Sequence, residues 1–352
     1  MFILKLLVFI LVLGVIILVH ELGHFLWAKK FKVHIYEFSI GMGPVIYTHK
    51  GKDKIDYNLR AIPIGGFVSM AGEVYEDDDT KKIPKKAFMC NKPWYQRIII
   101  MVAGVVNNFI FAILVLFATA CIWGGSILKP VVYSVVKDSP MEKAGVVAGD
   151  KILKINNHKV SSWEVAQIYL FMKDADNVYD FEIQHADGTI ETKGITPSII
   201  KDEETKKDVK LFGVAIEGEK TTNIVEHFKY AFVKFQSIVN SMVLTVYGLI
   251  SGKISINNLS GPVGIFSVVG ESLSAGIQYL LYITAFLSIN VGVVNILPFP
   301  AFDGGRVLFL LIEKIKGSPV NSKFENMCHT IGFALLMLLM IYITIHDIVG
   351  LF

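Results

Sequence analysis

The stretch IILVHELGHFLWAKK, from Ile16 to Lys30, places two histidines and a glutamate inside an apolar run that begins at the N-terminus. Ionisable side chains are costly in a bilayer and usually serve a function there. The simpler alternative is that they are interfacial polar residues at the end of a membrane span. The rest of the sequence bears on which of these two interpretations holds.

Composition predicts an integral membrane protein. Of the 352 residues, 53% are apolar and 18% are charged, and the mean hydropathy is +0.53. A soluble domain with a charged surface rarely has this balance. The formal net charge is only +3 and no basic, aromatic-interleaved face is present, so we expect no nucleic acid partner. The three cysteines are scattered and lack metal-binding spacing.

Four apolar stretches are long enough to cross about 30 Å of hydrocarbon as helices. They run approximately from Phe2 to Trp27, Ile98 to Gly124, Ile277 to Phe302 and Cys328 to Leu351. The first is too long for a secretory signal and no small-residue cleavage site follows it, so we expect it to stay in the mature protein. The expected fold is a polytopic α-helical membrane protein with four transmembrane helices.

Basic residues beside the spans predict the orientation, because cytoplasmic loops carry an excess of lysine and arginine. These residues are Lys29, Lys30, Lys32, Lys85, Lys86, Lys92, Arg97, Arg306, Lys314 and Lys316. Their loops should be cytoplasmic. Both termini and residues 129–273 should then be extracytoplasmic, on the outer side of the cell membrane.

The polar groups of the first span have the spacing of a zinc site. His20 and His24 lie four residues apart, so in a helix both side chains project from one face and can reach a single ion. Glu21 can reach a water on that ion. In this H-E-x-x-H pattern zinc lowers the pKa of its water to about 7, and the glutamate takes up the proton. A catalytic zinc has three protein ligands, so two histidines leave a place for a carboxylate.

The third span supplies a candidate carboxylate. It ends NVGVVNILPFPAFDGGRVLFLLIE, and Asp303 lies at its cytoplasmic end, at the predicted depth of His24. Pro298 and Pro300 should break the helix ahead of Asp303. Irregular backbone at this depth is tolerated only when it is buried in protein or lines a cavity. Alone, D-G-G is typical of a turn, but its pairing with the first-span motif predicts the third ligand.

Residues 128–217 are predicted to form a small soluble α+β module. Alternating apolar and polar residues predict short strands, and SSWEVAQIYLFMK predicts one helix. The string SPMEKAGVVAGDKILKINNHKV is similar to the core of a PDZ domain, a fold that captures extended peptides as an added edge strand. A β-rich cap without a ligand is the alternative, because matching a fold does not demonstrate a groove.

Residues 218–276 contain a long helical stretch in which Lys229 and Lys234 interrupt apolar positions. We expect an amphipathic region on the membrane surface. A fifth span is the competing interpretation, but it would put His20 and Asp303 on opposite faces of the bilayer. The expected domains are an N-terminal membrane core (1–127), the PDZ-like domain (128–217), the surface region (218–276) and a C-terminal membrane core (277–352).

HELGH and NILPFPAFDGG together resemble the two motifs of the site-2 protease family of intramembrane zinc metalloproteases, in its bacterial branch for regulated intramembrane proteolysis. The resemblance covers nearly the whole chain and includes FSIGMGP and IPIGGFVSMAGE, which are similar to membrane-entering β segments. It implies zinc ligation by His20, His24 and Asp303, and a general-base role for Glu21. One departure is Val105, which stands where the family usually has proline.

The resemblance also implies residues that hold the substrate. A transmembrane helix hides its carbonyls in internal hydrogen bonds, so it must be unwound before water can attack. Strands between the first two spans could pair with the unwound segment, although a simple cytoplasmic hairpin is the alternative. The candidate substrate-binding residues are Gly41, Gly43, Gly65, Gly66, Asn108 and Asn295. Asn295 either donates a hydrogen bond to the substrate backbone or the oxyanion, or forms a hydrogen bond between two helices. Asn108 either packs between helices or positions the substrate.

The leading hypothesis is a zinc endopeptidase that cleaves transmembrane segments of single-span proteins near their cytoplasmic end. By resemblance, its substrates are anti-sigma factors and remnant signal peptides. The PDZ-like module would filter substrates by size or sense a trimmed C-terminus. Two other classes stay open: a non-proteolytic PDZ-bearing receptor with a structural zinc site, and a zinc transporter, which should carry acidic or histidine residues along several spans.

Overall fold

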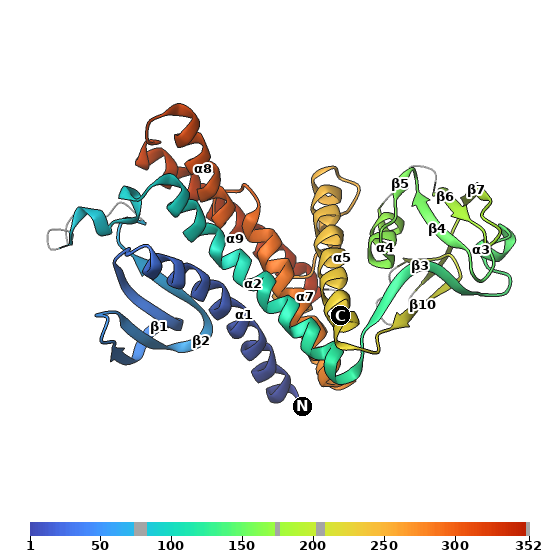
Figure 1. Ribbon diagram of the computed structural model, residues 1–352, viewed down its shortest axis with the longest axis horizontal. Coiled ribbons are helices and arrows are strands. Elements are labelled where there is room, and N and C mark those ends of the chain that lie inside the picture. Colours follow the sequence, from blue (N-terminus) through green and yellow to red (C-terminus); the bar gives the residue numbers. More distant parts are fainter. Residues whose placement is uncertain (74–82, 173–176, 202–207, 350–352) are drawn as a thin grey trace. The chain divides into compact units, whose positions relative to one another are not determined.

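The computed structural model describes residues 1–73, 83–172, 177–201 and 208–349. The chain divides into two compact units, both visible in Figure 1. The first consists of Met1–Val115 and Gly261–Ile345, and the second of Leu116–Ser260 and His346–Phe352. All the predicted site residues belong to the first unit, and the predicted PDZ-like segment belongs to the second.

The first unit is built mainly of helices, several of them long and apolar. They are α1 (Phe2–Lys30), α2 (Trp94–Trp123, which continues into the second unit), α6 (Pro262–Ala275), α7 (Ile277–Ile296), α8 (Asp303–Lys316) and α9 (Ser322–Val349); the short 3-10 turns η2 (Lys85–Ala87) and η3 (Met89–Asn91) precede α2. Pro262 occupies the first turn of α6, where its missing N–H costs nothing. Gly317 ends α8 in the left-handed conformation. The predicted helix break ahead of Asp303 is confirmed, because α7 ends at Ile296.

A β-hairpin lies beside α1 (Figure 1). It consists of β1 (Ile35–Lys50) and β2 (Asp56–Met70). Both strands bend, so that Ile40 pairs with Leu59 in the first half of β2 and with Gly66 in the second half. Gly41 and Gly65 lie at the bends with φ of 86° and 83°, a region that side chains with a Cβ disfavour. Within the described residues, positions 66–70 pair only with positions 35–40, which leaves one edge of β2 without a strand neighbour.

Apolar side chains fix α1 against its neighbours. One core joins α1, the hairpin and α2, with Phe25, Val33, Phe38, Val68 and Ile100 among its members. A second joins α1 to α6 and α7 through Ile16, Val269 and Leu280. Lipid tails are as apolar as these side chains, so it is their close van der Waals packing that holds the first helix in one register against its partners.

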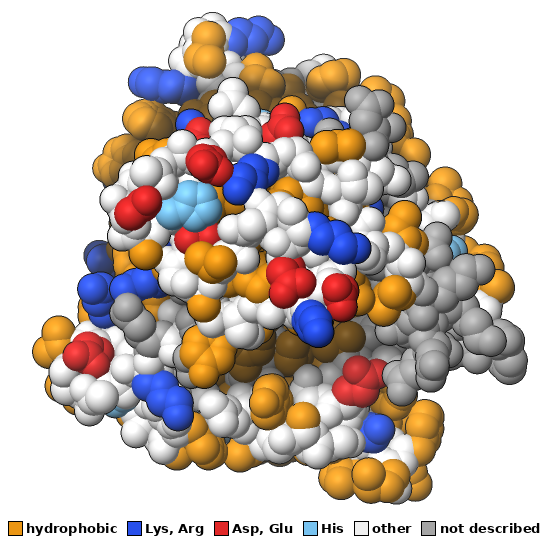
Figure 2. Space-filling view, turned by 90° about the vertical axis from the view of Figure 1, so that its right-hand side faces the viewer, with side chains coloured by type: hydrophobic (Ala, Val, Ile, Leu, Met, Phe, Trp, Pro, Cys, Tyr) orange, Lys and Arg blue, Asp and Glu red, His pale blue; other side chains and the backbone are white. Residues whose placement is uncertain are grey.

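The second unit is an α+β module. Its main sheet has six strands in the order β10-β3-β4-β6-β7, with β5 beside β4, and β8 and β9 form a separate pair. The strands are β3 (Ser126–Val135), β4 (Lys151–Ile155), β5 (His158–Lys159), β6 (Tyr179–Gln184), β7 (Ile190–Ile195), β8 (Ser198–Lys201), β9 (Asp208–Leu211) and β10 (Val214–Lys220); the helices are α3 (Pro140–Lys143), α4 (Trp163–Phe171), α5 (Ile224–Ile250) and the 3-10 turn η4 (Ile256–Asn258). Tyr179, Phe181 and Phe212 belong to its core. On the face shown in Figure 2, acidic and basic side chains are scattered among hydrophobic and other groups. The similarity to a PDZ domain stays a prediction.

Helices α4 and α5 pack along each other inside the second unit. Lys234 of α5 forms an ion pair with Glu164 of α4, and the Ser237 hydroxyl donates to the same carboxylate at 2.8 Å. Burial alone would raise the pKa of Glu164, but the Lys234 ammonium outweighs it and holds this pKa below its ordinary value. Further along α5, a Cβ on Gly248 would lie 3.3 Å from Met172 Cε. Contacts with α4 therefore extend along much of α5.

Among the described residues, five helices are long and apolar enough to cross a membrane, namely α1, α2, α5, α7 and α9. Four of them overlap the four predicted spans. The fifth, α5, is the segment expected on the membrane surface. These helices fit a multi-pass membrane protein, and the number of spans stays a prediction.

Candidate metal centre

Helix α1 presents His20 and His24 to α2, one turn apart. Both histidines are buried, each with 6% of its surface exposed. Two glycines allow the helices to come this close. A Cβ on Gly23 would lie 2.3 Å from the Ala103 carbonyl oxygen, and a Cβ on Gly104 would lie 2.6 Å from His24 Nε2. Neither position can carry a side chain without moving its neighbour.

The backbone of α2 fixes the tautomer of His24. The Nδ1 atom of His24 lies 2.8 Å from the Ile100 carbonyl oxygen. A carbonyl oxygen can only accept, so Nδ1 carries the proton and Nε2 keeps a lone pair. Histidines that bind metals commonly make this kind of bond through their other ring nitrogen. The Nε2 atom of His24 is therefore available to a metal.

Asp303, at the start of α8, reaches the same point although it lies 283 residues from His20. Its Oδ2 atom is 3.0 Å from His20 Nε2 and 3.3 Å from His24 Nε2, and the two Nε2 atoms are 3.2 Å apart. A tetrahedral zinc with bonds of about 2.0–2.2 Å separates its ligand atoms by roughly 3.3–3.6 Å. Two imidazoles and one carboxylate are a common ligand set for zinc. These three groups thus fit zinc in chemistry and in spacing.

Tight backbone packing brings Asp303 to the histidines. A Cβ on Gly304 would lie 2.2 Å from the Ile296 carbonyl oxygen, and one on Gly305 would lie 2.4 Å from the Phe299 carbonyl oxygen. Both glycines lie inside the first turn of α8, and neither has a positive φ. They act by letting the chain fold back closely on the end of α7.

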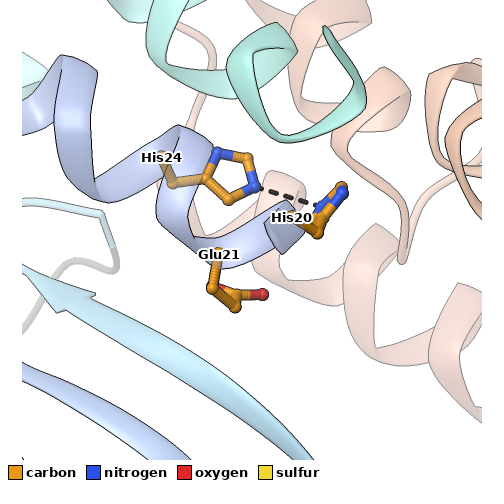
Figure 3. A group of neighbouring side chains, drawn as sticks. All are labelled: His20, Glu21 and His24. Atoms are coloured by element: carbon orange, nitrogen blue, oxygen red, sulfur yellow. Dashed lines mark hydrogen bonds between the residues drawn. The ribbon is translucent and has the colours of Figure 1, made fainter. Parts of the chain in front are cut away.

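Glu21 lies on the same turn of α1 as His20. Figure 3 shows the imidazoles of His20 and His24 directed at each other, with the Glu21 carboxylate beside them. The possible ligand atoms of all three residues lie within 4.8 Å of one another. A carboxylate at this distance can accept a proton from a water that the histidines and Asp303 surround.

These groups border a cavity of about 320 Å³. Its lining includes His20, Glu21, His24, Phe67, Val68, Met70, Glu73, Asn295, Asp303 and Arg306. Asn295 comes from the last turn of α7, so the structure brings this candidate to the cavity. The end of β2 contributes part of the apolar lining, through Phe67, Val68 and Met70.

The other predicted substrate-binding residues are not among the residues that line this cavity. They are Asn108, Gly41, Gly43, Gly65 and Gly66. Asn108 is fully buried, with its Nδ2 atom 3.4 Å from His20 Nδ1. Gly66 packs against the backbone, because a Cβ there would lie 2.7 Å from the Ser39 carbonyl oxygen. The glycines shape the hairpin whose last residues reach the cavity.

Glu73 and Arg306 were not predicted as site residues, yet both line the cavity and form an ion pair. Arg306 follows Asp303 by three residues, and this spacing puts both on one face of α8, so the sequence does carry a signal for it. Glu73 follows β2 and carries no such signal. The pair also borders a second cavity of about 380 Å³, which is lined in part by Arg97, Glu325 and His329.

Known proteins similar to this chain are named as proteases, several of them as zinc metalloproteases. The sequence profile of peptidase family M50 matches residues 8–339. A Clostridium acetobutylicum protein named as a zinc metalloprotease is 39% identical over 97% of this chain and 96% of its own. A Fusobacterium nucleatum protein of the same description is 36% identical over 98% and 99%. The regulator of sigma-W protease RasP from Bacillus subtilis is 30% identical over 100% of both chains. The chain therefore belongs to peptidase family M50 and is an intramembrane zinc metalloprotease of the site-2 protease type.

Proposed function

We propose that this protease cleaves transmembrane segments of single-span proteins near their cytoplasmic end, with His20, His24 and Asp303 holding zinc and Glu21 acting as the general base. One observation carries the assignment of the ligands. Three ligand atoms from two distant segments converge within 3.0–3.3 Å of one another beside a cavity between apolar helices.

The chain's own side chains supply the proton transfers. When bound, zinc supplies Lewis-acid chemistry, since it lowers the pKa of water and polarises a peptide carbonyl. Glu21 accepts the proton of the attacking water and returns it to the leaving amine. Asn295 faces the same cavity, where its amide can donate a hydrogen bond to the oxyanion that develops or to the substrate backbone.

The free edge of β2 offers a place for the unwound substrate. In the part of the chain that the structure describes, positions 66–70 lack a strand neighbour on one side, and Phe67, Val68 and Met70 of this stretch line the cavity. A substrate strand added to this edge would run along the site. Its backbone would regain the hydrogen bonds that it loses on leaving the helix. Gly41, Gly43, Gly65 and Gly66 would then serve the substrate indirectly, by setting the bends of the hairpin.

We propose four membrane spans, with α5 outside the bilayer. Glu164 and Met172 of the α4 segment contact α5 at Lys234 and Gly248, so one face of α5 packs against a charged, soluble module. Beyond Ser237 only 13 residues of α5 remain (250 − 237), about 20 Å of helix against the roughly 30 Å of hydrocarbon. With the basic loops in the cytoplasm, both termini and the second unit are extracytoplasmic.

The second unit contains a groove that suits a trimmed C-terminus. A cavity of about 780 Å³ is lined by Phe212, Gly213 and Val214 at the start of β10, by Trp163, Leu170 and Phe171 of α4, and by Lys137, Lys210 and Lys253. β10 lies at an end of the sheet order, so an extended peptide can add to it. The apolar wall would take the last side chain, and the lysines would attract the terminal carboxylate.

The proposed substrates are anti-sigma factors and remnant signal peptides. The name of the Bacillus subtilis relative describes it as a regulator of sigma-W protease. This favours an anti-sigma factor whose extracytoplasmic part has already been trimmed by another protease. The PDZ-like groove would then meet the new C-terminus on the outer face while the site cuts near the inner one.

The test uses the purified full-length chain in proteoliposomes with a trimmed, single-span anti-sigma-type substrate. Cleavage within the transmembrane segment is expected, with loss on chelation and recovery on adding zinc. Asp303→Asn should lower both zinc content and cleavage, whereas the control His49→Ala, at an exposed position of β1, should change neither. Wild-type cleavage by Asp303→Asn, or cleavage that survives chelation, would contradict the proposal.

A further inference from the structure

Asn108 is buried between helices with its amide directed at a histidine of the proposed metal centre. Its exposed fraction is 0%, and its Nδ2 atom lies 3.4 Å from His20 Nδ1. The Ser288 hydroxyl of α7 donates to the backbone carbonyl oxygen of Asn108 at 3.0 Å, which holds this turn of α2 in place. A side chain this buried cannot reach a substrate without a rearrangement of the helices around it.

The two orientations of this amide differ in whether its buried oxygen has a hydrogen-bond partner. As drawn, Asn108 Oδ1 is buried and has no hydrogen-bond partner among the described residues. The oxygen and nitrogen of an amide exchange places on a half-turn and are assigned from the surrounding bonds. Turned over, Oδ1 takes the place beside His20 Nδ1 and accepts a hydrogen bond from the Nδ1–H. A buried acceptor is then satisfied.

This orientation also selects the tautomer that a metal needs. A neutral imidazole carries one N–H, so a proton held at Nδ1 leaves a lone pair on Nε2. The Nε2 atom of His20 is the one directed at Asp303 and His24. On the preceding turns of α2, the Ile100 carbonyl oxygen accepts a hydrogen bond from His24 Nδ1, which leaves the lone pair of His24 on Nε2. Between them, Gly104 leaves room for both rings. Ile100, Gly104 and Asn108 are spaced by four residues and form one stripe of α2.

We infer that Asn108 is a positioning residue for His20, from whose Nδ1–H it accepts a hydrogen bond, and not a substrate-binding residue. The inference rests on the proposed role of His20 as a zinc ligand. It makes α2 the element that sets the ring orientation of both histidines, one through a backbone carbonyl and one through a side chain. Groups that bond metal-ligating histidines in this way typically change metal affinity 10–100-fold when removed.

The experiment compares Asn108→Leu with Asn108→Asp in the full-length protein. Zinc affinity is measured in detergent by competition with a chromogenic chelator, together with KM and kcat for the substrate. Asn108→Leu removes the acceptor and should weaken zinc binding about 10–100-fold. Asn108→Asp keeps an acceptor of the same shape and should bind zinc at least as tightly as the wild type. The KM should stay unchanged in both variants.

Two control variants separate failure of this inference from failure of the proposed ligand set. Asn107→Leu, one residue away on α2 with its amide on the Val19 carbonyl, should keep the wild-type zinc affinity. If Asn108→Leu does not fold, Asn108→Ala takes its place. Wild-type affinity in the apolar variant, or an equal loss in Asn108→Asp, would overturn the inference while His20→Ala still loses zinc. Undiminished zinc binding by His20→Ala would instead overturn the proposed ligand set.

Discussion

At the scale of residues, Gly104 leaves almost no room around the two histidines. An added Cβ would lie 2.6 Å from His24 Nε2 and 2.7 Å from His20 Cε1. We expect Gly104→Ala to push both rings from their places and to lower zinc affinity and cleavage by about tenfold or more, since overpacking costs roughly 1–3 kcal/mol. The measurement is zinc competition together with the cleavage rate.

A matched glycine of α1 provides the control for this substitution. A Cβ on Gly14 would lie 3.5 Å from the Pro63 carbonyl oxygen, which is an ordinary contact. Gly14→Ala should therefore keep wild-type zinc affinity and activity. Equal behaviour of the two alanine variants would show that the packing of α2 on the histidines is unimportant.

The sequence predicts the ligands but not the groups that hold them. His20, Glu21 and His24 are recognisable because a helix puts positions four apart on one face. Ile100 takes part through its carbonyl oxygen, which any residue type provides. Asn108 contacts His20 only because α2 crosses α1 in one particular register, and this register depends on packing that no local pattern encodes.

At the scale of elements, the ion pair between Glu73 and Arg306 joins the end of β2 to α8. The two side chains are 20% and 33% exposed and border both cavities. Glu73→Arg would place like charges together and release the end of β2 from the site. We expect the cleavage rate to fall about tenfold, because losing a partly buried ion pair has an energetic cost of about that size.

The double variant Glu73→Arg/Arg306→Glu tests whether the pairing itself matters. It restores opposite charges and should recover most of the cleavage rate, which a double-mutant cycle measures as a coupling energy. Losses that simply add in the double variant would exclude the ion pair as the cause.

The link between α4 and α5 should weaken in acid. Because the folded pKa of Glu164 lies below its ordinary value, the Lys234 pair stabilises the second unit above that ordinary pKa. This contribution is lost as the pH falls through the folded pKa. Glu164→Gln should lower the unfolding temperature by roughly 2–4 °C at neutral pH, and the difference should vanish well below pH 4. Thermal scans monitored by tryptophan fluorescence can follow this, and a difference independent of pH would contradict it.

The elements themselves were largely predictable, and their pairings were not. The strands and helix of the second unit follow from alternation and periodicity. The hairpin bends back so that Ile40 has partners in both halves of β2, which depends on glycines at Gly41 and Gly65 with φ of 86° and 83°. Glycine in a strand indicates a bend or a close approach, but it does not say which strand returns to which.

At the scale of the whole molecule, the position of α5 decides the topology. In a chain whose cysteines Cys90, Cys121 and Cys328 are replaced by serine, single cysteines at Lys220 and Ser251 would lie on either side of α5. If α5 stays outside the bilayer, a membrane-impermeant maleimide labels both in intact cells. A cysteine at Lys52, in the hairpin turn, should react only after permeabilisation. Labelling at position 251 only after permeabilisation would mean that α5 crosses the membrane.

Composition alone could not decide whether α5 crosses the membrane. The helix α5 is long and apolar enough to count as a span. Its contacts with Glu164 and Met172 argue otherwise, as does the contact between His20 and Asp303, which a fifth span would put on opposite faces of the bilayer. Such contacts join segments about 70 residues apart in sequence, as with Glu164 and Lys234, and no window of hydropathy contains them.

The central claim is that this chain is a protease whose general base is Glu21, and Glu21→Gln tests it most directly. The variant keeps the shape of the side chain and all three proposed zinc ligands, so its zinc content should equal that of the wild type. Its rate of cleavage of a trimmed single-span substrate should fall by about 10²–10⁴-fold. In cells, uncut membrane stubs should accumulate. Undiminished cleavage by a zinc-loaded Glu21→Gln protein would contradict the account.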